Sequence, residues 1–175
     1  MSPLKPAPNA PLVHLALGSN LGDRREHLRR AVAELRGRAA AEIVGSSALY
    51  ATAAVGIDAG PEFLNAALAL RTPLSPEELL ELCLSLELEA GRLRQEGQWI
   101  SRPLDLDLLA WAGITRDSPR LILPHPRLQE RGFVLAPLCE IAPELVVRGQ
   151  TIAAWTAAAD LNGVQRLAGS EGWAD

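Results

Sequence analysis

The stretch RPLDLDLLAW, residues 102–111, places Asp105 and Asp107 two positions apart within a run of leucines. Alternate residues of a β-strand point to the same face, so in a strand the two carboxylates would emerge roughly 6.6 Å apart along the chain. Two like charges this close repel, and burying them is costly unless a cation compensates. The chemistry of this stretch therefore depends on which cation neutralises the pair.

Two kinds of cation suit the aspartate pair. Mg²⁺ is a hard ion that binds carboxylate oxygens and often holds phosphates in its remaining positions. Two such ions, about 3.5 to 4 Å apart, can share the pair. Alternatively, the stretch is an edge strand with one wet face, and neighbouring arginines pair with its acids. Because D-x-D is short and common, the spacing alone leaves both interpretations open.

Arginines dominate the sequence around the aspartates. Seven lie between residues 92 and 131: Arg92, Arg94, Arg102, Arg116, Arg120, Arg127 and Arg131. Lys5 is the only lysine, which excludes a Walker-type phosphate lysine. His125 is held between two prolines in LPHPR; a lone histidine is more often structural than catalytic. Nevertheless, acids for a metal, arginines for phosphate and a fixed donor together describe a polyphosphate site.

The only two phenylalanines, Phe63 and Phe133, flank this region in sequence, and Asn65 interrupts the apolar run FLNAALALRT. Two rings and an amide suit a flat heterocycle. They suit a hydrophobic core equally well, with Asn65 bonded to a neighbouring loop. From the residues alone, the core interpretation is favoured.

Hydrophobic patterning predicts the elements that position these residues. Strands are predicted at residues 12–17, 42–52 and 63–72 and at the aspartate stretch. A helix with its buried stripe at Leu28, Ala31, Val32 and Leu35 follows an Asp23 N-cap and stops at Gly37. A second helix begins at the Ser75/Glu78 capping box and ends at Gly91. The order βαββαβ is typical of an α+β, ferredoxin-like sandwich with an antiparallel sheet and both helices on one face.

The remaining segments are predicted to add to this core. A short strand is predicted at residues 121–123, a helix broken by Pro137 at residues 133–141, and a weak helix at residues 151–159. No regular element is predicted at the end of the chain. Residues 1–11 contain four prolines and are expected to be a flexible tail. The length of 175 residues then matches a single domain spanning residues 12–175, with C-terminal helical additions.

Composition narrows the function classes. The net charge of −4 argues against general nucleic-acid binding, which needs a basic face. Cys83 and Cys139 lie in apolar helical contexts and are expected to be buried thiols rather than a disulfide. No signal peptide and no membrane-spanning run is present in the sequence given, so we expect a cytoplasmic protein without a membrane partner.

Four blocks of the sequence, in this order and spacing, resemble a known family. They are LALGSNLGDR, FLNAAL, RPLDLDLL and LPHPRLQERGFVLAPLCEIAPEL. They closely resemble 6-hydroxymethyl-7,8-dihydropterin pyrophosphokinase of folate biosynthesis, over residues 12–145; the last two blocks are the most specific. The resemblance implies an ATP-dependent diphosphotransferase, which moves the β,γ-diphosphate of ATP onto the hydroxymethyl group of 6-hydroxymethyl-7,8-dihydropterin and releases AMP.

The resemblance also implies residue roles, carried over by position. Asp105 and Asp107 would bind two Mg²⁺ ions that bridge the ATP phosphates, and Arg92 and Arg102 would contact the transferred phosphates. The ATP-binding residues would be Glu87, Trp99, Arg120, His125 and Arg131. The pterin-binding residues would be Thr52, Val55, Gly56, Phe63, Asn65 and Phe133. The attacking hydroxyl belongs to the substrate, so no protein nucleophile is needed, and a monomer is expected.

The chain departs from the family pattern at Ala53-Ala54, where members often carry Pro-Pro. Some members carry a basic residue in place of Gln95 and an aromatic residue in place of Pro126, and Phe63 stands where tyrosine is also seen. These departures affect loop stiffness and single ATP contacts rather than the reaction.

Two other classes of protein are alternatives to the pyrophosphokinase. A metal-dependent nucleotidyltransferase would release pyrophosphate, but its acceptor groove fits the acidic balance poorly. A ligand-binding regulatory domain would need neither metal ligands nor so many arginines.

Overall fold

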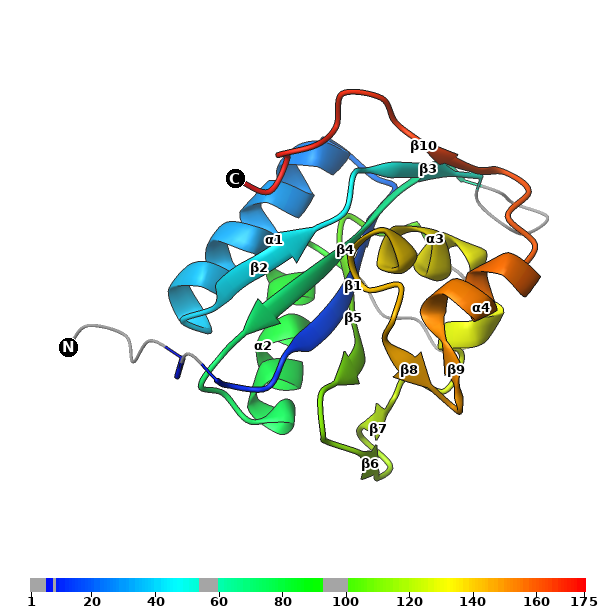
Figure 1. Ribbon diagram of the computed structural model, residues 1–175. Coiled ribbons are helices and arrows are strands. Elements are labelled where there is room, and N and C mark those ends of the chain that lie inside the picture. The colour runs from blue at the N-terminus through cyan, green and yellow to red at the C-terminus, as the bar shows by residue number, and fades with distance from the viewer. Residues whose placement is uncertain (1–5, 8, 54–59, 93–100) are drawn as a thin grey trace.

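A computed structural model of the protein describes residues 6, 7, 9–53, 60–92 and 101–175. Helices cover both faces of a central sheet (Figure 1). The strands of this sheet are β1 (Val13–Ser19), β2 (Glu42–Ser46), β3 (Tyr50–Thr52), β4 (Phe63–Arg71), β5 (Asp105–Trp111) and β10 (Val164–Arg166). The helices are α1 (Arg24–Arg38), α2 (Pro76–Glu89), α3 (Gly132–Ile141) and α4 (Ile152–Ala158), with a 3-10 turn at Leu128–Glu130. Two small hairpins are β6 (Arg116–Asp117) with β7 (Ile122–Leu123) and β8 (Val146–Val147) with β9 (Gln150–Thr151).

All pairings in the main sheet are antiparallel, and the strand order is β10-β3-β4-β1-β5, with β2 also paired to β4. The prediction of an antiparallel α/β sandwich is therefore confirmed. The prediction of one continuous strand over residues 42–52 is wrong, because residues 47–49 leave the ladder. Ser47 Oγ accepts from the Ala67 N–H, the Ala48 N–H donates to Glu140, and the Leu49 N–H donates to Ser170 Oγ.

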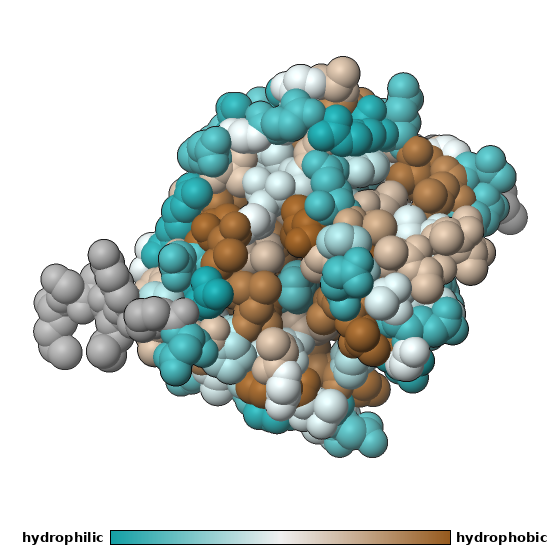
Figure 2. Space-filling model, viewed as in Figure 1, coloured by the Kyte–Doolittle hydropathy of each residue, from teal (hydrophilic) through white to brown (hydrophobic). Residues whose placement is uncertain are grey.

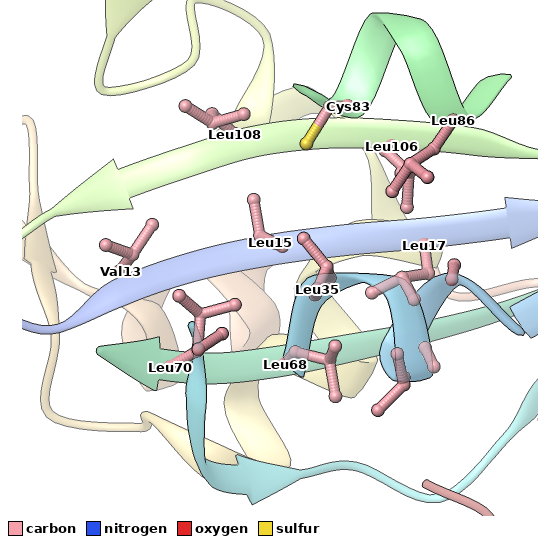
Figure 3. Close-up of a cluster of buried hydrophobic side chains, with 14 of the residues drawn as sticks. Val13, Leu15, Leu17, Leu35, Leu68, Leu70, Cys83, Leu86, Leu106 and Leu108 are labelled. Carbon is pink, nitrogen blue, oxygen red and sulfur yellow. The ribbon is translucent and has the colours of Figure 1, made fainter. Parts of the chain in front are cut away.

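The main core lies between the sheet and the pair α1 and α2. Figure 3 shows leucines of β1, β4 and β5 meeting Leu35 of α1 and Cys83 and Leu86 of α2. Both helices thus cover one face, as the sequence predicts. A second, smaller core on the other face joins Ala67 and Leu109 of the sheet to α3, α4 and the 3-10 turn.

The helix start signals work as the sequence predicts. Asp23 caps α1 by accepting from the Glu26 N–H, and Ser75 and Glu78 form a reciprocal capping box at α2. The predicted stop at Gly37 is one residue early, because α1 ends at Arg38. The Ala39 N–H still bonds to the Leu35 carbonyl, and the chain turns at Ala40, with φ +46°. A glycine inside a helix is tolerated where the buried stripe continues past it.

Pro137 does not break α3, contrary to the prediction. It removes one backbone donor from the helix, but burial of Val134, Leu135 and Leu138 on both sides of it holds the helix together.

The cysteine prediction is confirmed in part: both thiols are free, Cys83 is buried, and Cys139 is only half-buried.

The end of the chain is ordered, although no element was predicted there. β10 pairs with β3, and the chain then passes along the sheet to bury Trp173 beside α1 (Figure 1). The Trp173 indole donates to the Ser47 carbonyl over 2.8 Å, and Ser170 Oγ accepts from the Leu49 N–H. The C-terminal segment therefore covers the break between β2 and β3.

Replacing Trp173 with alanine should lower the free energy of unfolding by about 3 kcal/mol or more, because a buried indole and its hydrogen bond are both lost. Urea unfolding measures this change. Trp155→Ala is the control, since Trp155 is half-buried on α4 and should cost less. An unchanged midpoint for Trp173→Ala would show that the C-terminal segment does not stabilise the fold.

On the face that Figure 2 shows, hydrophilic residues are widespread and hydrophobic residues form separated patches. Within the described ranges, no helix is long and apolar enough to cross a membrane.

Candidate active site

One face of the sheet gathers the residues that the sequence singled out. Gly18 of β1 pairs with Asn65 of β4 on one side and with Asp105 of β5 on the other, and directly opposed residues point to the same face. Thr52 of β3 is opposite Phe63 in the same way. Alternation adds Asp107 to this face, which is the face that α3 covers.

Gly18 allows this close arrangement, and the sequence analysis missed its role. A Cβ at Gly18 would lie 3.0 Å from Asn65 Oδ1 and 3.7 Å from Asp105 Cβ. A side chain at this position would collide with the Asn65 amide and lie between it and Asp105. The signal was the glycine at the strand end in LALGSN.

Arginines hold both aspartates. Arg92 Nη1 lies 2.6 Å from Asp105 Oδ1, Arg102 Nη2 lies 3.1 Å from Asp105 Oδ2, and Arg131 Nη1 lies 3.2 Å from Asp107 Oδ2. β5 is also the last strand in the sheet order. Both features of the edge-strand interpretation are therefore present, so the aspartates are neutralised by arginine in this state of the protein.

The arginines keep unused donors. Among the described residues, the Nε atoms of Arg102 and Arg131 are buried without a hydrogen-bond partner. A buried donor without an acceptor is costly, and a phosphate oxygen is an acceptor that a guanidinium binds well. The two arginines thus lie beside the acids with capacity for an anion.

Glu87 organises the same region from α2. Its carboxylate is 2% exposed, accepts from the Leu106 N–H over 2.8 Å, and lies 2.5 Å from Arg92 Nη1. Leu106 is the residue between the two aspartates, so Glu87 fixes both that peptide and the guanidinium that reaches Asp105. In the structure, Glu87 therefore contacts Arg92 and the backbone of β5.

The electrostatics single out Asp107 and His125. Burial and the neighbouring Asp105 raise the pKa of Asp107, so its negative charge is unfavourable without further positive charge. Burial, with Arg131 and Arg127 nearby, lowers the pKa of His125, which favours neutral imidazole at pH 7. Its Nδ1 accepts from the Arg127 N–H over 3.1 Å, which leaves the proton on Nε2 as a donor.

A pocket of about 350 Å³ opens beside β5, between α2 and residues 118–126. Its lining residues combine apolar side chains with the charged residues of the site: Leu80, Leu84, Glu87, Arg92, Asp105, Leu106, Asp107, Leu108, Ser118, Pro119, Arg120, Leu121, Ile122, His125 and Pro126. Thr52, Phe63, Asn65 and Phe133 are not among them. The aspartates therefore separate this pocket from the polar and aromatic group on β3, β4 and α3.

That second group is preorganised. Asn65 Nδ2 donates to Thr52 Oγ1 over 2.8 Å, and both side chains are buried. The guanidinium of Arg102 lies 5.7 Å from the centre of the Phe63 ring, and that of Arg131 lies 5.9 Å from the centre of the Phe133 ring. Each ring is thereby linked to an arginine that also contacts an aspartate.

Not every predicted residue joins the group. Arg120 is exposed and ion-paired with Glu81 at the outer edge of the pocket. Val55, Gly56 and Trp99 lie outside the described residues.

The donor set suits a hard cation that keeps substrate oxygens as ligands. In the ranges that the structure describes, no three His, Cys, Asp or Glu side chains gather to hold a metal by themselves. Mg²⁺ is commonly bound by one or two carboxylates, with water and substrate phosphates completing its coordination, and two carboxylates beside free arginine donors fit that description.

An antiparallel α/β fold with acids, arginines and a pocket on one side defines an enzyme of the phosphate-transfer class. Comparison with known proteins names the particular family. The family model for 7,8-dihydro-6-hydroxymethylpterin-pyrophosphokinase (HPPK) matches residues 14–143, and the chain belongs to this family.

Relatives agree over most of the chain. The 2-amino-4-hydroxy-6-hydroxymethyldihydropteridine pyrophosphokinase of Methylorubrum extorquens is 44% identical over 88% of this chain and 97% of its own length. That of Bacillus subtilis is 46% identical over 77% of this chain and 80% of its own length. Among solved structures, wild-type HPPK-DHPS of Plasmodium falciparum matches with a TM-score of 0.65 and 14% identity, over 86% of this chain; the chain spans 45% of that longer protein.

Proposed function

We propose that this protein transfers the β,γ-diphosphate of ATP to the hydroxymethyl group of 6-hydroxymethyl-7,8-dihydropterin in folate biosynthesis, with AMP as the other product. Family membership supports the reaction. The observation that carries it in this chain is the aspartate pair flanked by buried, unpartnered arginine Nε donors. Phosphoryl transfer needs positioning and charge stabilisation more than a protein nucleophile.

We assign the two sides of the aspartates to the two substrates. The pocket beside β5 takes ATP, with Glu87 and His125 at its inner side and Arg120 at its entrance. Arg131 reaches the same site through its ion pair with Asp107. The opposite side takes the pterin, with Asn65 and Thr52 on its edge and Phe63 and Phe133 against its faces. Support comes from the strand register: Asn65 and Asp105 flank Gly18, roughly 10 Å apart across two strand spacings.

We further propose that Asp105 and Asp107 hold two Mg²⁺ ions, which supply neutralisation of the ATP phosphates. Side chains of the protein then bind the phosphates and stabilise their charge. Arg92 and Arg102 turn from Asp105 to the transferred diphosphate and stabilise the charge that develops on it. Neutral His125 donates from Nε2 to a phosphate oxygen, and Arg131 uses its free Nε in the same way.

The ferredoxin-like assignment remains part of this proposal, as do a cytoplasmic location and a monomeric state. Its support is the order of β3, β4, β1 and β5 with α1 and α2 on one face. No observation favours nucleic acid as a partner, since the net charge is −4.

Product analysis tests the function. The protein is mixed with ATP, Mg²⁺ and 6-hydroxymethyl-7,8-dihydropterin, and AMP, ADP and pyrophosphate are separated. We expect AMP that depends on the pterin. Pyrophosphate release would favour a nucleotidyltransferase, and no nucleotide product from folded protein would favour a binding domain.

Replacing Asn65 with alanine should raise the KM for the pterin at least about tenfold, because an amide that pairs with a polar heterocycle edge contributes most when it is buried. The KM for ATP should stay within about twofold. Steady-state kinetics with each substrate varied measures both values. Thr52→Val is the companion variant, since it removes the hydroxyl that accepts from Asn65; an equal rise in both KM values for Asn65→Ala would contradict the assignment to the pterin side.

A further inference from the structure

Asn20 follows β1 directly, in the GSNLG turn, and its side chain is 2% exposed. Its amide is bonded to two segments that are distant in sequence. Nδ2 donates to the Pro61 carbonyl over 3.1 Å and to Ser101 Oγ over 3.0 Å, while Oδ1 accepts from the Arg102 N–H over 2.7 Å. The Asn20 N–H also donates to the Arg102 carbonyl over 3.1 Å.

These contacts lead to both halves of the candidate site. Pro61 is two residues before Phe63, which forms a wall of the proposed pterin side. Arg102 reaches Asp105 on the phosphate side. Because Asn20 binds both main-chain polar groups of Arg102, it fixes the peptide from which that guanidinium extends.

The same two segments touch each other elsewhere. A Cβ at Gly60 would clash with Ser101 Oγ, so the glycine lets the two segments approach without moving that side chain. The Arg102 guanidinium lies over the Phe63 ring. Asn20 is thus the buried amide at a junction where the pterin wall, the phosphate arginine and the end of β1 meet.

We propose that Asn20 is a positioning residue that couples pterin binding to nucleotide binding by holding the Pro61–Phe63 and Ser101–Arg102 segments in one arrangement. This inference rests on the proposed function. When one substrate orders one segment, the shared amide orders the other, so the second substrate binds to a site that is already arranged. Asn20 itself need not touch either substrate.

A purely structural role is the alternative, because buried amides are nearly always hydrogen-bonded. The two roles differ in what a substitution changes. A structural role lowers stability without a specific effect on how one substrate alters the affinity for the other. A coupling role reduces that mutual effect in protein that remains folded.

The test measures the Kd of 6-hydroxymethyl-7,8-dihydropterin by fluorescence, with and without Mg²⁺ and a non-hydrolysable ATP analogue. The variants are Asn20→Ala, which removes all three side-chain bonds, and Asn20→Asp, which keeps the acceptor for the Arg102 N–H but loses the donor to Pro61. Thr72→Val is the matched control. Thr72 is equally a buried polar residue with two bonds to the backbone, at Ala39 and Leu74, and these lie outside the site.

In the wild type, the analogue should lower the Kd of the pterin. In Asn20→Ala that effect should fall by about tenfold or more, and kcat should drop by a similar factor, while the analogue alone still binds within about threefold. The effect of the analogue in Asn20→Asp should lie between that in the wild type and that in Asn20→Ala. Thr72→Val should lower the melting temperature but leave the coupling unchanged.

Two results would overturn the inference: an Asn20→Ala variant with wild-type coupling, or equal loss of coupling in Thr72→Val. A wild type in which the analogue leaves the pterin Kd unchanged would overturn it as well. Failure of the proposed function is a separate result, since it appears as wild-type protein that forms no pterin-dependent AMP.

Discussion

Replacing Asp107 with alanine is expected to lower pterin-dependent AMP formation by about a thousandfold or more, in a protein that still folds. Asp107 lies on the sheet face between the two proposed substrate sides, and its partner Arg131 belongs to the same site. Removing this carboxylate removes a proposed metal ligand and half of the aspartate pair. AMP formation, followed by chromatography, measures the loss.

Asp160→Ala is the control for Asp107→Ala, because Asp160 is an exposed aspartate whose side chain accepts from the Asn162 N–H. It should retain nearly full activity. Activity above about a tenth of the wild type in Asp107→Ala would exclude a metal-binding role for this residue.

The ionised carboxylate of Asp107 should lower the free energy of unfolding of the metal-free protein. Burial and Asp105 raise the pKa of Asp107 above that of the unfolded chain, so the folded protein binds its proton more tightly. Ionisation therefore destabilises the fold; the penalty is present in full above the raised pKa and disappears below the unfolded value of about 3.9.

It follows that Asp107→Asn should be more stable than the wild type at pH 7.5 without Mg²⁺, and that the difference should shrink as the pH falls toward 4. Urea unfolding across this range measures the trend. Lower stability of Asp107→Asn at pH 7.5 would mean that the ion pair with Arg131 outweighs the cost of burial.

Replacing Arg102 with alanine is expected to lower kcat by about 10² to 10³ with smaller changes in either KM, because a donor that strengthens its contact in the transition state acts mainly on kcat. Arg102 reaches Asp105, lies over Phe63 and keeps a buried, unpartnered Nε. Steady-state kinetics with both substrates varied separates kcat from KM.

Two variants sharpen the Arg102 result. Arg102→Lys keeps the charge but not the planar fork, and should recover only part of the loss. Arg38→Ala removes an arginine that is ion-paired to Glu89 on the helical surface, and should leave kcat unchanged. A rise in KM alone for Arg102→Ala would place Arg102 in ground-state binding instead.

Much of the fold could be predicted because its signals are local. The capping box at Ser75, the N-cap at Asp23 and the alternation in β5 depend only on neighbouring residues, and the structure has each of them. The aspartate pair shares a face for the same reason, since alternation is a property of the strand itself. The errors at Gly37 and Pro137 arose because burial of a helix face outweighed the preference of one residue.

Pairing between distant segments could not be predicted in this way. Residues 47–49 leave the sheet because Glu140 and Ser170, which are 92 and 121 residues from their partners, take up the backbone donors of Ala48 and Leu49. β10 forms because the edge of β3 offers unpaired backbone groups, and only the tertiary fold places the end of the chain there.

The sequence by itself determined the family resemblance, the reactive residue types and the face that the aspartates share. Only the tertiary structure decided that arginines neutralise those aspartates, that Gly18 lies between Asn65 and Asp105, and that Asn20 joins the segments of Pro61 and Arg102. The physical reason is that spacing along a strand fixes direction, whereas distances between strands and loops depend on which buried polar groups find partners across the fold.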